Sequence, residues 1–313
     1  MKSSKILAVV AMASLFAASS YADDVYGAIT VKKVKNNAGV EKTVAYIDDD
    51  SKETPVITKN IEVDSVFFNR KFKKGAASTL MLPIEANYSA NSLTGFQVYR
   101  FIEVTKDCID YCKFRVNCSE SAGTFEANTP YVVFSNEKDD AQISFHAQNG
   151  SKIVLNTTTR DKVYSYVVQE NVDQPYKFSF TGTYESIEFK NPKGIYGFAG
   201  VEKNGTKIGD FVHVACKDGK CASIRPFRAY LKVTLASLNK SASDDDVEFP
   251  ETIEVYLVDS DKKGTTYIGQ MNTSTGEIVK EDNRWFDMKG RVLDHKPTAK
   301  GTYYNNKKKV IIK

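Results

Sequence analysis

The cysteines are the residues of this chain whose spacing most directly suggests chemistry. Cys216 and Cys221 enclose the four residues Lys-Asp-Gly-Lys, and Cys108 and Cys112 enclose three residues. Asp-Gly favours a tight hairpin turn, so the first pair can close the neck of a hairpin. Disulfides persist in oxidising compartments. For an exported chain, the spacing therefore predicts a Cys216–Cys221 disulfide and, by the same argument, a Cys108–Cys112 disulfide.

The fifth cysteine, Cys118, has no partner in this scheme and lies in phase with Phe114 and Val116 on one face of an expected strand. This position predicts a buried, inert thiol. A nucleophilic role would require a base. The available histidines are His146, His213 and His295. The first two lie in strand-like patterns that favour packing roles, and the third lies in a basic C-terminal segment, so cysteine catalysis is not expected.

Metal and cofactor sites are not expected either. Neither cysteine pair has the two-residue gap of a zinc knuckle. The acidic runs Asp48–Asp50 and Asp244–Asp246 lack the spaced oxygen ligands and the glycine of an EF-hand loop. We interpret these runs as solvated turns or linkers, with a loose calcium site as the alternative.

The chain also lacks the short motifs that announce common enzymes. It contains no P-loop, dinucleotide-binding fingerprint, Gly-x-Ser-x-Gly elbow or His-Glu-x-x-His. Carboxylates are plentiful, however, and β-fold hydrolases often have no linear signature. The sequence therefore predicts a protein without catalytic residues and leaves a secreted hydrolase as an alternative.

The residue pattern of the chain indicates that these residues are positioned by β-strands. Apolar and polar residues alternate in many short runs, which turn signals such as Asn36–Gly39 separate. The clearest runs are Ile29–Val31, Val44–Ile47, Phe96–Val104, Phe114–Val116, Ile143–Phe145, Val163–Val168, Tyr176–Phe180 and Tyr230–Val233. Many short strands at this spacing predict an all-β chain whose main domain is a β-sandwich or jelly roll.

Composition divides the chain into four parts. Residues 1–22 are predicted to be a signal peptide, and residues 23–236 a β-sandwich that includes an N-terminal hairpin. Residues 237–252 are polar and acidic, as expected of a linker. Residues 253–313 are predicted to form a small C-terminal β domain.

The N-terminal segment has the features of an export signal. Two lysines precede the apolar run Ile6–Phe16, and the small residues Ser20 and Ala22 occupy the −3 and −1 positions of a signal-peptidase site. Cleavage is therefore expected between Ala22 and Asp23. The apolar run is too short to span a bilayer. We expect a secreted protein that passes through the periplasm to the cell surface or the medium, with no transmembrane segment in the mature chain.

Positive charge is concentrated at the C-terminal end. The formal charge of the chain is +4, and loss of the two lysines in the leader leaves +2. Residues 284–313 hold nine Lys and Arg against two Asp, so the remaining body carries −5. No nucleic-acid-binding signature accompanies this charge. The basic balance is therefore a property of the tail and does not predict a nucleic-acid partner.

The tail also has a strand–turn–strand pattern with a basic last strand. It resembles the C-terminal sorting domains of type IX (Por) secretion cargo, although it is short and lacks an upstream Tyr-Pro-Asn-Pro-like strand. The matching positions are Phe286, Asp287, Gly290, Arg291, Leu293, Lys300, Gly301, Tyr303, Lys309, Val310, Ile312 and Lys313. The resemblance implies delivery by an outer-membrane secretion machinery, which would be the partner of this segment. The alternative is an ordinary basic hairpin that closes a β domain.

Three segments of the body resemble a β module of secreted bacterial proteins. They are Phe68–Ala86, Glu126–Val133 and Ile224–Leu231. The resemblance implies architecture without an assigned activity. Within these segments, Thr79–Pro83 is predicted to be a buried strand that ends at proline, and Arg225–Tyr230 an edge strand entered through proline.

Aromatic residues crowd one further stretch: Tyr164, Tyr166, Tyr176, Phe178, Phe180, Tyr184, Tyr196 and Phe198. An exposed row of such rings could stack on sugars, but alternation with polar residues favours core packing. The sequence thus predicts a secreted or surface-displayed, non-catalytic β-sandwich protein for adhesion, binding or envelope structure. Its partner would be a glycan or a surface protein. The alternatives are a polysaccharide-binding module that accompanies secreted hydrolases and, third, a secreted hydrolase.

Overall fold

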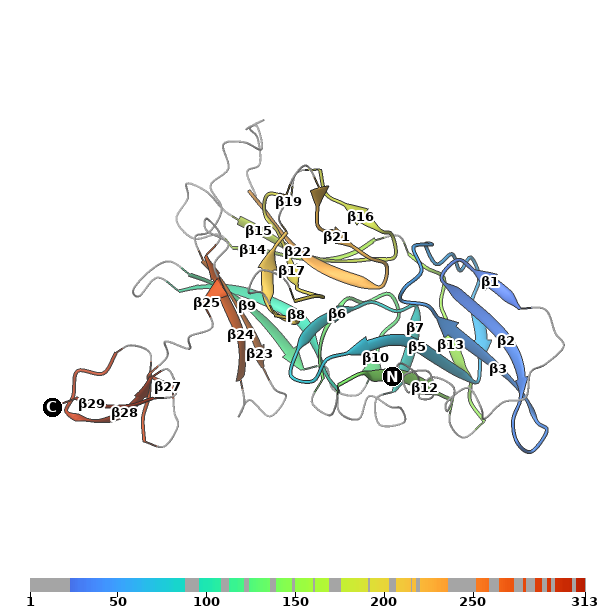
Figure 1. The fold of residues 1–313 in the computed structure, drawn as a ribbon, viewed down its shortest axis with the longest axis horizontal. Coiled ribbons are helices and arrows are strands. Elements are labelled where there is room, and N and C mark those ends of the chain that lie inside the picture. The colour runs from blue at the N-terminus through green and yellow to red at the C-terminus, as the bar shows by residue number, and fades with distance from the viewer. Residues whose placement is uncertain are drawn as a thin grey trace, which may run out of the picture.

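The structure is a computed structural model, and it confirms the all-β prediction in the part of the chain that it describes. That part comprises residues 23–87, 96–107, 113–120, 124–135, 139–147, 150–159, 161–168, 176–190, 192–202, 207–214, 216–217, 220–235, 252–258, 265–272, 278–279, 285–288, 292–293, 296–305 and 308–312. Within these ranges every regular element is a strand (Figure 1). They contain no apolar helix of membrane-spanning length.

The N-terminal half is a sandwich of two sheets. One sheet has the order β1 (Asp24–Tyr26), β2 (Ile29–Lys35), β3 (Glu41–Ile47), β5 (Ser65–Phe72) and β12 (Ala141–His146). The other has the order β10 (Thr124–Phe125), β7 (Ile84–Asn87), β13 (Ile153–Leu155) and β4 (Ile61–Val63). Inward residues such as Phe68, Ile84 and Leu155 belong to one buried cluster. Alternation along each strand therefore buries one face, as predicted.

The β2–β3 hairpin forms where turn chemistry predicted it. The Asn36 side chain accepts hydrogen bonds from the backbone N–H groups of Ala38 and Val40 at 3.0 and 2.9 Å. Gly39 has a φ of 76°, a conformation that glycine adopts without steric cost. This turn fixes the register that pairs Ile29 with Ile47.

A second pair of sheets encloses a second core. The larger sheet has the order β25 (Ile278–Val279), β24 (Thr265–Asn272), β23 (Thr252–Val258), β9 (Lys113–Glu120), β8 (Phe96–Asp107), β11 (Tyr131–Ser135) and β6 (Ala77–Leu80). The smaller has the order β14 (Asp161–Val168), β15 (Tyr176–Thr183), β22 (Arg228–Leu235), β17 (Ile195–Phe198) and β18 (Phe211–His213). Phe101 and Phe180 stack across this core with ring centroids 5.9 Å apart.

The segment around Phe227 joins the two cores. Phe227 is fully buried and packs against Phe68 and Tyr184 at centroid distances of 5.9 and 5.8 Å. The Thr79 hydroxyl donates to the carbonyl of Ala229 and accepts from its N–H, both at 2.9 Å. The start of β22 is therefore fixed against β6 by apolar packing and by hydrogen bonds.

Two segments next to proline were predicted from the sequence to be strands. The segment Arg225–Tyr230 was expected to be an edge strand, and its strand residues Arg228–Tyr230 pair with β15 alone. β17 joins β22 only further along, at Leu231 and Lys232, so the strand as a whole lies between β15 and β17. Pro226 precedes the strand, so it removes no ladder hydrogen bond. The prediction for Thr79–Pro83 is confirmed in its burial, since Leu80, Met81 and Leu82 are fully buried.

The strands of residues 253–313 divide between two sheets. β23 pairs in parallel with β9 and so continues a sheet of the preceding region. β26 (Trp285–Phe286), β27 (Val292–Leu293), β28 (Gly301–Asn305) and β29 (Lys308–Ile312) form a separate four-stranded sheet (Figure 1). The expected boundary at residue 253 therefore does not coincide with a boundary between sheets. Residues 1–22 and most of the expected linker 237–252 lie outside the described ranges.

Two short ribbons complete the described fold. β16 (Ile187–Glu188) pairs with β21 (Ser223–Ile224), immediately before the segment that joins the cores. β19 (Cys216–Lys217) pairs with β20 (Lys220–Cys221). A disulfide joins Cys216 to Cys221, as the spacing predicted. Cys108 and Cys112 lie outside the described residues.

Candidate functional site

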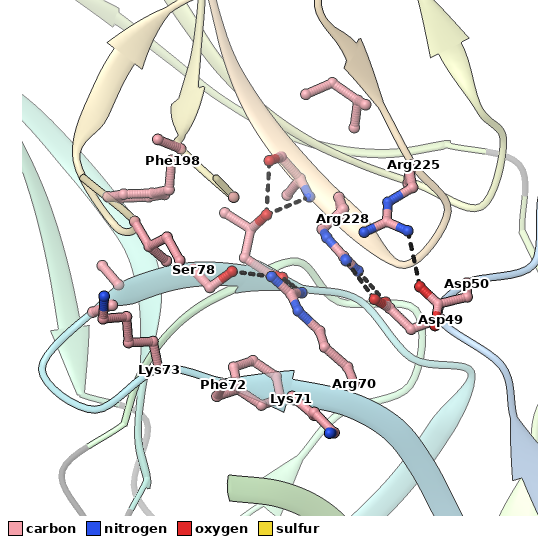
Figure 2. Close-up of a pocket in the computed structure, with 18 of the residues that line it drawn as sticks. Asp49, Asp50, Arg70, Lys71, Phe72, Lys73, Ser78, Phe198, Arg225 and Arg228 are labelled. Atoms are coloured by element: carbon pink, nitrogen blue, oxygen red, sulfur yellow. Dashed lines mark hydrogen bonds and ion pairs between the residues drawn. The ribbon is translucent and has the colours of Figure 1, made fainter. Parts of the chain in front are cut away.

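A cleft of about 650 Å³ lies between β5, β6 and the start of β22. This size is typical of small-molecule sites. Its charged lining comes from segments far apart in sequence: Asp49 and Asp50 follow β3, Arg70 lies on β5, and Arg225 and Arg228 flank the start of β22 (Figure 2). The fold therefore brings three guanidinium groups and two carboxylates to one end of the cleft.

Arg228 and Asp49 form a bidentate ion pair at this end. Arg228 Nη2 donates to Asp49 Oδ2 at 2.7 Å, and Nη1 donates to Oδ1. The Asp49 backbone N–H also donates to the side-chain oxygen of Asn69 at 2.7 Å. Asp49 is only 5% exposed, so the expectation that this acidic run would be a solvated turn is wrong for its central residue. Burial was missed because the paired arginine lies 179 residues away.

The ion pair sets the protonation state of Asp49. Burial alone would raise the pKa of this carboxyl, because a low-dielectric surrounding disfavours the charged form. The hydrogen bonds and charge of Arg228, with Arg70 and Arg225 nearby, outweigh burial and lower the pKa. Asp49 is therefore held as a carboxylate.

Arg225 and Asp50 form a second, more exposed pair. Arg225 Nη1 lies 3.2 Å from Asp50 Oδ1, and the Asp50 side chain is 84% exposed. Water screens such a pair, so its contribution to stability is small. Arg225 therefore remains available to the open part of the cleft.

Arg70 differs from the other two arginines. Its guanidinium donates to the carbonyl of Thr79 at 2.7 Å and to the hydroxyl of Ser78, and it lies 4.7 Å from the centre of the Phe72 ring. Among the described residues, no carboxylate lies within ion-pair distance of it. Burial and, next, the positive charge of Arg228 lower its pKa well below the usual value, and the negative charge of the nearby Asp49 offsets only part of this shift. Both effects are those of a charge without a full counter-charge.

The sequence contains a signal for Arg70 that the search for motifs missed. β5 buries Val66, Phe68 and Phe72 at alternate positions, and Arg70 occupies the same side of the strand. A charged residue within a buried period-2 series is unusual, because buried charges need partners. Such a break in alternation marks a functional or structural site without indicating its partner.

The residues considered for catalysis have ordinary surroundings. Cys118 is buried, and burial raises the pKa of its thiol to about 12, which confirms the predicted inert thiol. Burial also lowers the pKa of both His146 and His213. His146 lies beside Phe67 and His213 beside Tyr196, in ring contacts at 5.5 and 5.2 Å. His295 lies outside the described residues. In the described part of the chain, no group of His, Cys, Asp or Glu could hold a metal ion.

The described rings of the crowded aromatic stretch pack into the cores, as alternation indicated, Tyr184 into the first and the others into the second. Phe178, Phe180, Tyr184 and Tyr196 are buried, and Phe198 packs partly buried against the same cluster. Tyr164 and Tyr176 also pack against this core, whereas the side chain of Tyr166 is not described. Among the rings of this stretch whose side chains the structure describes, there is therefore no exposed row for sugars.

The expected sorting residues lie on the four-stranded C-terminal sheet. Phe286 pairs with Tyr304, and Leu293 with Trp285. Lys309, Val310 and Ile312 lie on β29, opposite the strand that holds Gly301 and Tyr303. Asp287 follows β26, and Lys300 directly precedes β28. Gly290, Arg291 and Lys313 lie outside the described residues, as does Ala22 of the expected cleavage site. Asp23 forms an ion pair with Lys32 at 2.7 Å.

Comparisons with known proteins found no match, whether with protein-family models, with curated proteins or with solved structures.

Proposed function

We propose that this chain is a secreted or surface-displayed β-sandwich protein that acts by binding rather than by catalysis. The observation that carries the proposal is the state of the carboxylates in the cleft. Asp49 is held ionised by Arg228, and Asp50 is paired with Arg225. A glycosidase needs one carboxyl with a raised pKa to act as the general acid. The pKa of Asp49 is shifted in the opposite direction, which suits a charge partner of Arg228 rather than a general acid.

Delivery by the C-terminal sheet is the second part of the proposal. β28 and β29 form a hairpin, and β29 exposes Lys309 and Ile311 at the outer edge of the sheet order. An edge strand offers unpaired backbone groups to which a receptor strand can pair. Lysine side chains on such an edge discourage pairing between copies of the chain, and a receptor of opposite charge could still bind there. A segment of this kind suits recognition by an outer-membrane secretion machinery.

Deletion of residues 285–313 tests the delivery step. We expect the full chain at the cell surface or in the medium and the shortened chain in the periplasm. Thermal unfolding of the shortened chain should match that of the full chain, which controls for loss of folding. Surface delivery of the shortened, folded chain at the full level would contradict this part of the proposal.

Polysaccharide binding is a second candidate function, favoured by a row of rings on the outer face of the first sheet. Tyr46 stacks on Phe67 at 5.6 Å with an interplanar angle of 20°, and the exposed His146 ring meets the edge of Phe67. Hydroxyl groups of Ser65 and Ser144 lie within 3.1 and 3.2 Å of His146. Rings beside hydroxyl groups suit sugar stacking.

A pull-down with insoluble polysaccharides tests this candidate. We expect Phe67→Ala to reduce retention and Val56→Ala, an exposed change outside the row, to leave it unchanged. Equal retention of both variants would show that the row is not a binding surface.

A further inference from the structure

The end of the cleft that holds the three arginines has one positive charge more than its two carboxylates, Asp49 and Asp50, neutralise. Arg225 and Arg228 each have an aspartate partner, Asp50 and Asp49. Arg70 is the third guanidinium of the group, and its described hydrogen bonds go to the neutral oxygens of Ser78 and Thr79. Those bonds orient the guanidinium without compensating its charge.

An incompletely compensated charge in a half-buried position is energetically costly. A guanidinium has five N–H donors, and the two described bonds of Arg70 use two of them. The remaining donors can bind an oxyanion in bidentate geometry, for which arginine is better suited than lysine. The cost of holding Arg70 in place would then be offset when an anion enters the cleft.

The rest of the lining indicates what would carry that anion. The partly buried Phe198 ring and the Phe72 ring line the same cleft (Figure 2). Ser223 adds a hydroxyl group to the lining. Lys73, at another part of the cleft, is already paired with Glu202 at 2.8 Å. Lys71 adds a positive charge to the lining, and Asp139 and Asp140 add two negative charges, so the surplus is a property of the end that holds Arg70. Aromatic rings, neutral polar groups and one surplus charge at that end suit a sugar that carries a single anionic group.

We infer that this cleft binds an acidic sugar, with Arg70 and Arg225 holding its oxyanion, which is either a carboxylate or a sulfate ester. The inference rests on the proposed binding function and names its ligand class. The Arg228–Asp49 pair positions this site by fixing the start of β22 against the segment that follows β3.

Titration of the purified full chain with D-glucuronate, glucose 6-sulfate, glucose and inorganic sulfate tests the inference by calorimetry. We expect at least one charged sugar to bind roughly tenfold or more tightly than glucose, as a charged hydrogen bond would provide. It should also bind roughly tenfold or more tightly than inorganic sulfate, because the sugar ring and its hydroxyl groups add contacts with the aromatic and polar lining. Binding of D-glucuronate would identify the oxyanion as a carboxylate, and binding of glucose 6-sulfate would identify it as a sulfate ester. Equal binding of glucose, equal binding of inorganic sulfate, or no binding of any probe would overturn the inference.

Variants locate the site. Arg70→Met should weaken binding of the charged sugar by roughly 10- to 100-fold. Arg225→Met should weaken it less and guards against a folding defect, since Arg225 is exposed. Lys33→Met removes the same charge from an exposed position outside the cleft lining and should leave binding unchanged. Unchanged binding by both arginine variants would place the ligand elsewhere and overturn the assignment.

The same preparation separates failure of the inference from failure of the proposed function. Loss of all binding with no hydrolysis would remove the acidic-sugar assignment and leave delivery and a binding role intact. Release of reducing ends from a polysaccharide would contradict the non-catalytic proposal itself, whichever probe binds.

Discussion

The cleft has a paired side, at the Arg228–Asp49 ion pair, and an unpaired side, at Arg70. The two arginines differ in how their positive charge is compensated. Arg228 has a bidentate aspartate partner, whereas Arg70 has neutral hydrogen-bond acceptors and an aromatic ring. The first arrangement joins two distant chain segments, and removal of either partner would leave a buried charge. The second keeps a charge at some cost to stability. The contrast separates a residue that holds the fold from one that is available to a ligand.

Breaking the Arg228–Asp49 ion pair should produce the largest loss of stability. Asp49→Ala leaves Arg228 without its counter-charge in a site where the two side chains are 7% and 13% exposed. We expect the free energy of unfolding to fall by about 3–5 kcal/mol, the usual cost of breaking a buried pair. Chemical denaturation of the variant and the wild type measures this difference.

Replacing both partners sharpens that result. An Asp49→Leu, Arg228→Met double variant has no unpaired charge, so it should be more stable than Asp49→Ala by roughly 2 kcal/mol or more. A double variant as unstable as the sum of the single changes would show that the two side chains contribute independently.

Lowering the pH should reduce the stability that the Arg228–Asp49 pair provides and should not change the contribution of Arg70. The pKa of Asp49 is lower in the folded than in the unfolded chain, so its contribution to stability is complete above the unfolded pKa of about 3.9. It should decrease as the pH falls below that value, because the unfolded chain then binds a proton more readily than the folded chain. Denaturation curves between pH 6 and pH 3 should converge for wild type and Asp49→Asn. Parallel curves over this range would contradict the assigned ion pair.

The sequence predicted the scaffold of this contrast more readily than its chemistry. Alternation located the strands around Phe145, Phe178 and Leu231, because burial of one face depends on local periodicity alone. The cross-strand disulfide Cys216–Cys221 also follows from short-range spacing.

The ion pairs could not be predicted in the same way. Asp49 and Arg228 are brought together by the packing of two cores around Phe227, and this depends on the full topology. The internal position of the later part of β22 has the same origin, since a proline just before a strand does not reveal that β17 joins it at Leu231 and Lys232. Only the position of Arg70 on the buried face of β5 was visible locally.

Removing the charge of Arg70, on the unpaired side, should change the stability of the ligand-free protein only weakly, and in the opposite direction to the loss of Asp49. Arg70→Met keeps an apolar side chain of similar length and removes a costly charge, and it gives up the guanidinium contact with the Phe72 ring and two hydrogen bonds to neutral acceptors. These changes nearly cancel, so we expect the free energy of unfolding to stay within about 1 kcal/mol of the wild type or to rise. Asp50→Asn, at the exposed pair, provides the matched reference and should change stability by about 0.5 kcal/mol or less. A loss for Arg70→Met as large as that for Asp49→Ala would mean that Arg70 is itself a structural residue. In that case the two sides of the cleft would not differ in kind, and the surplus charge would no longer indicate a ligand.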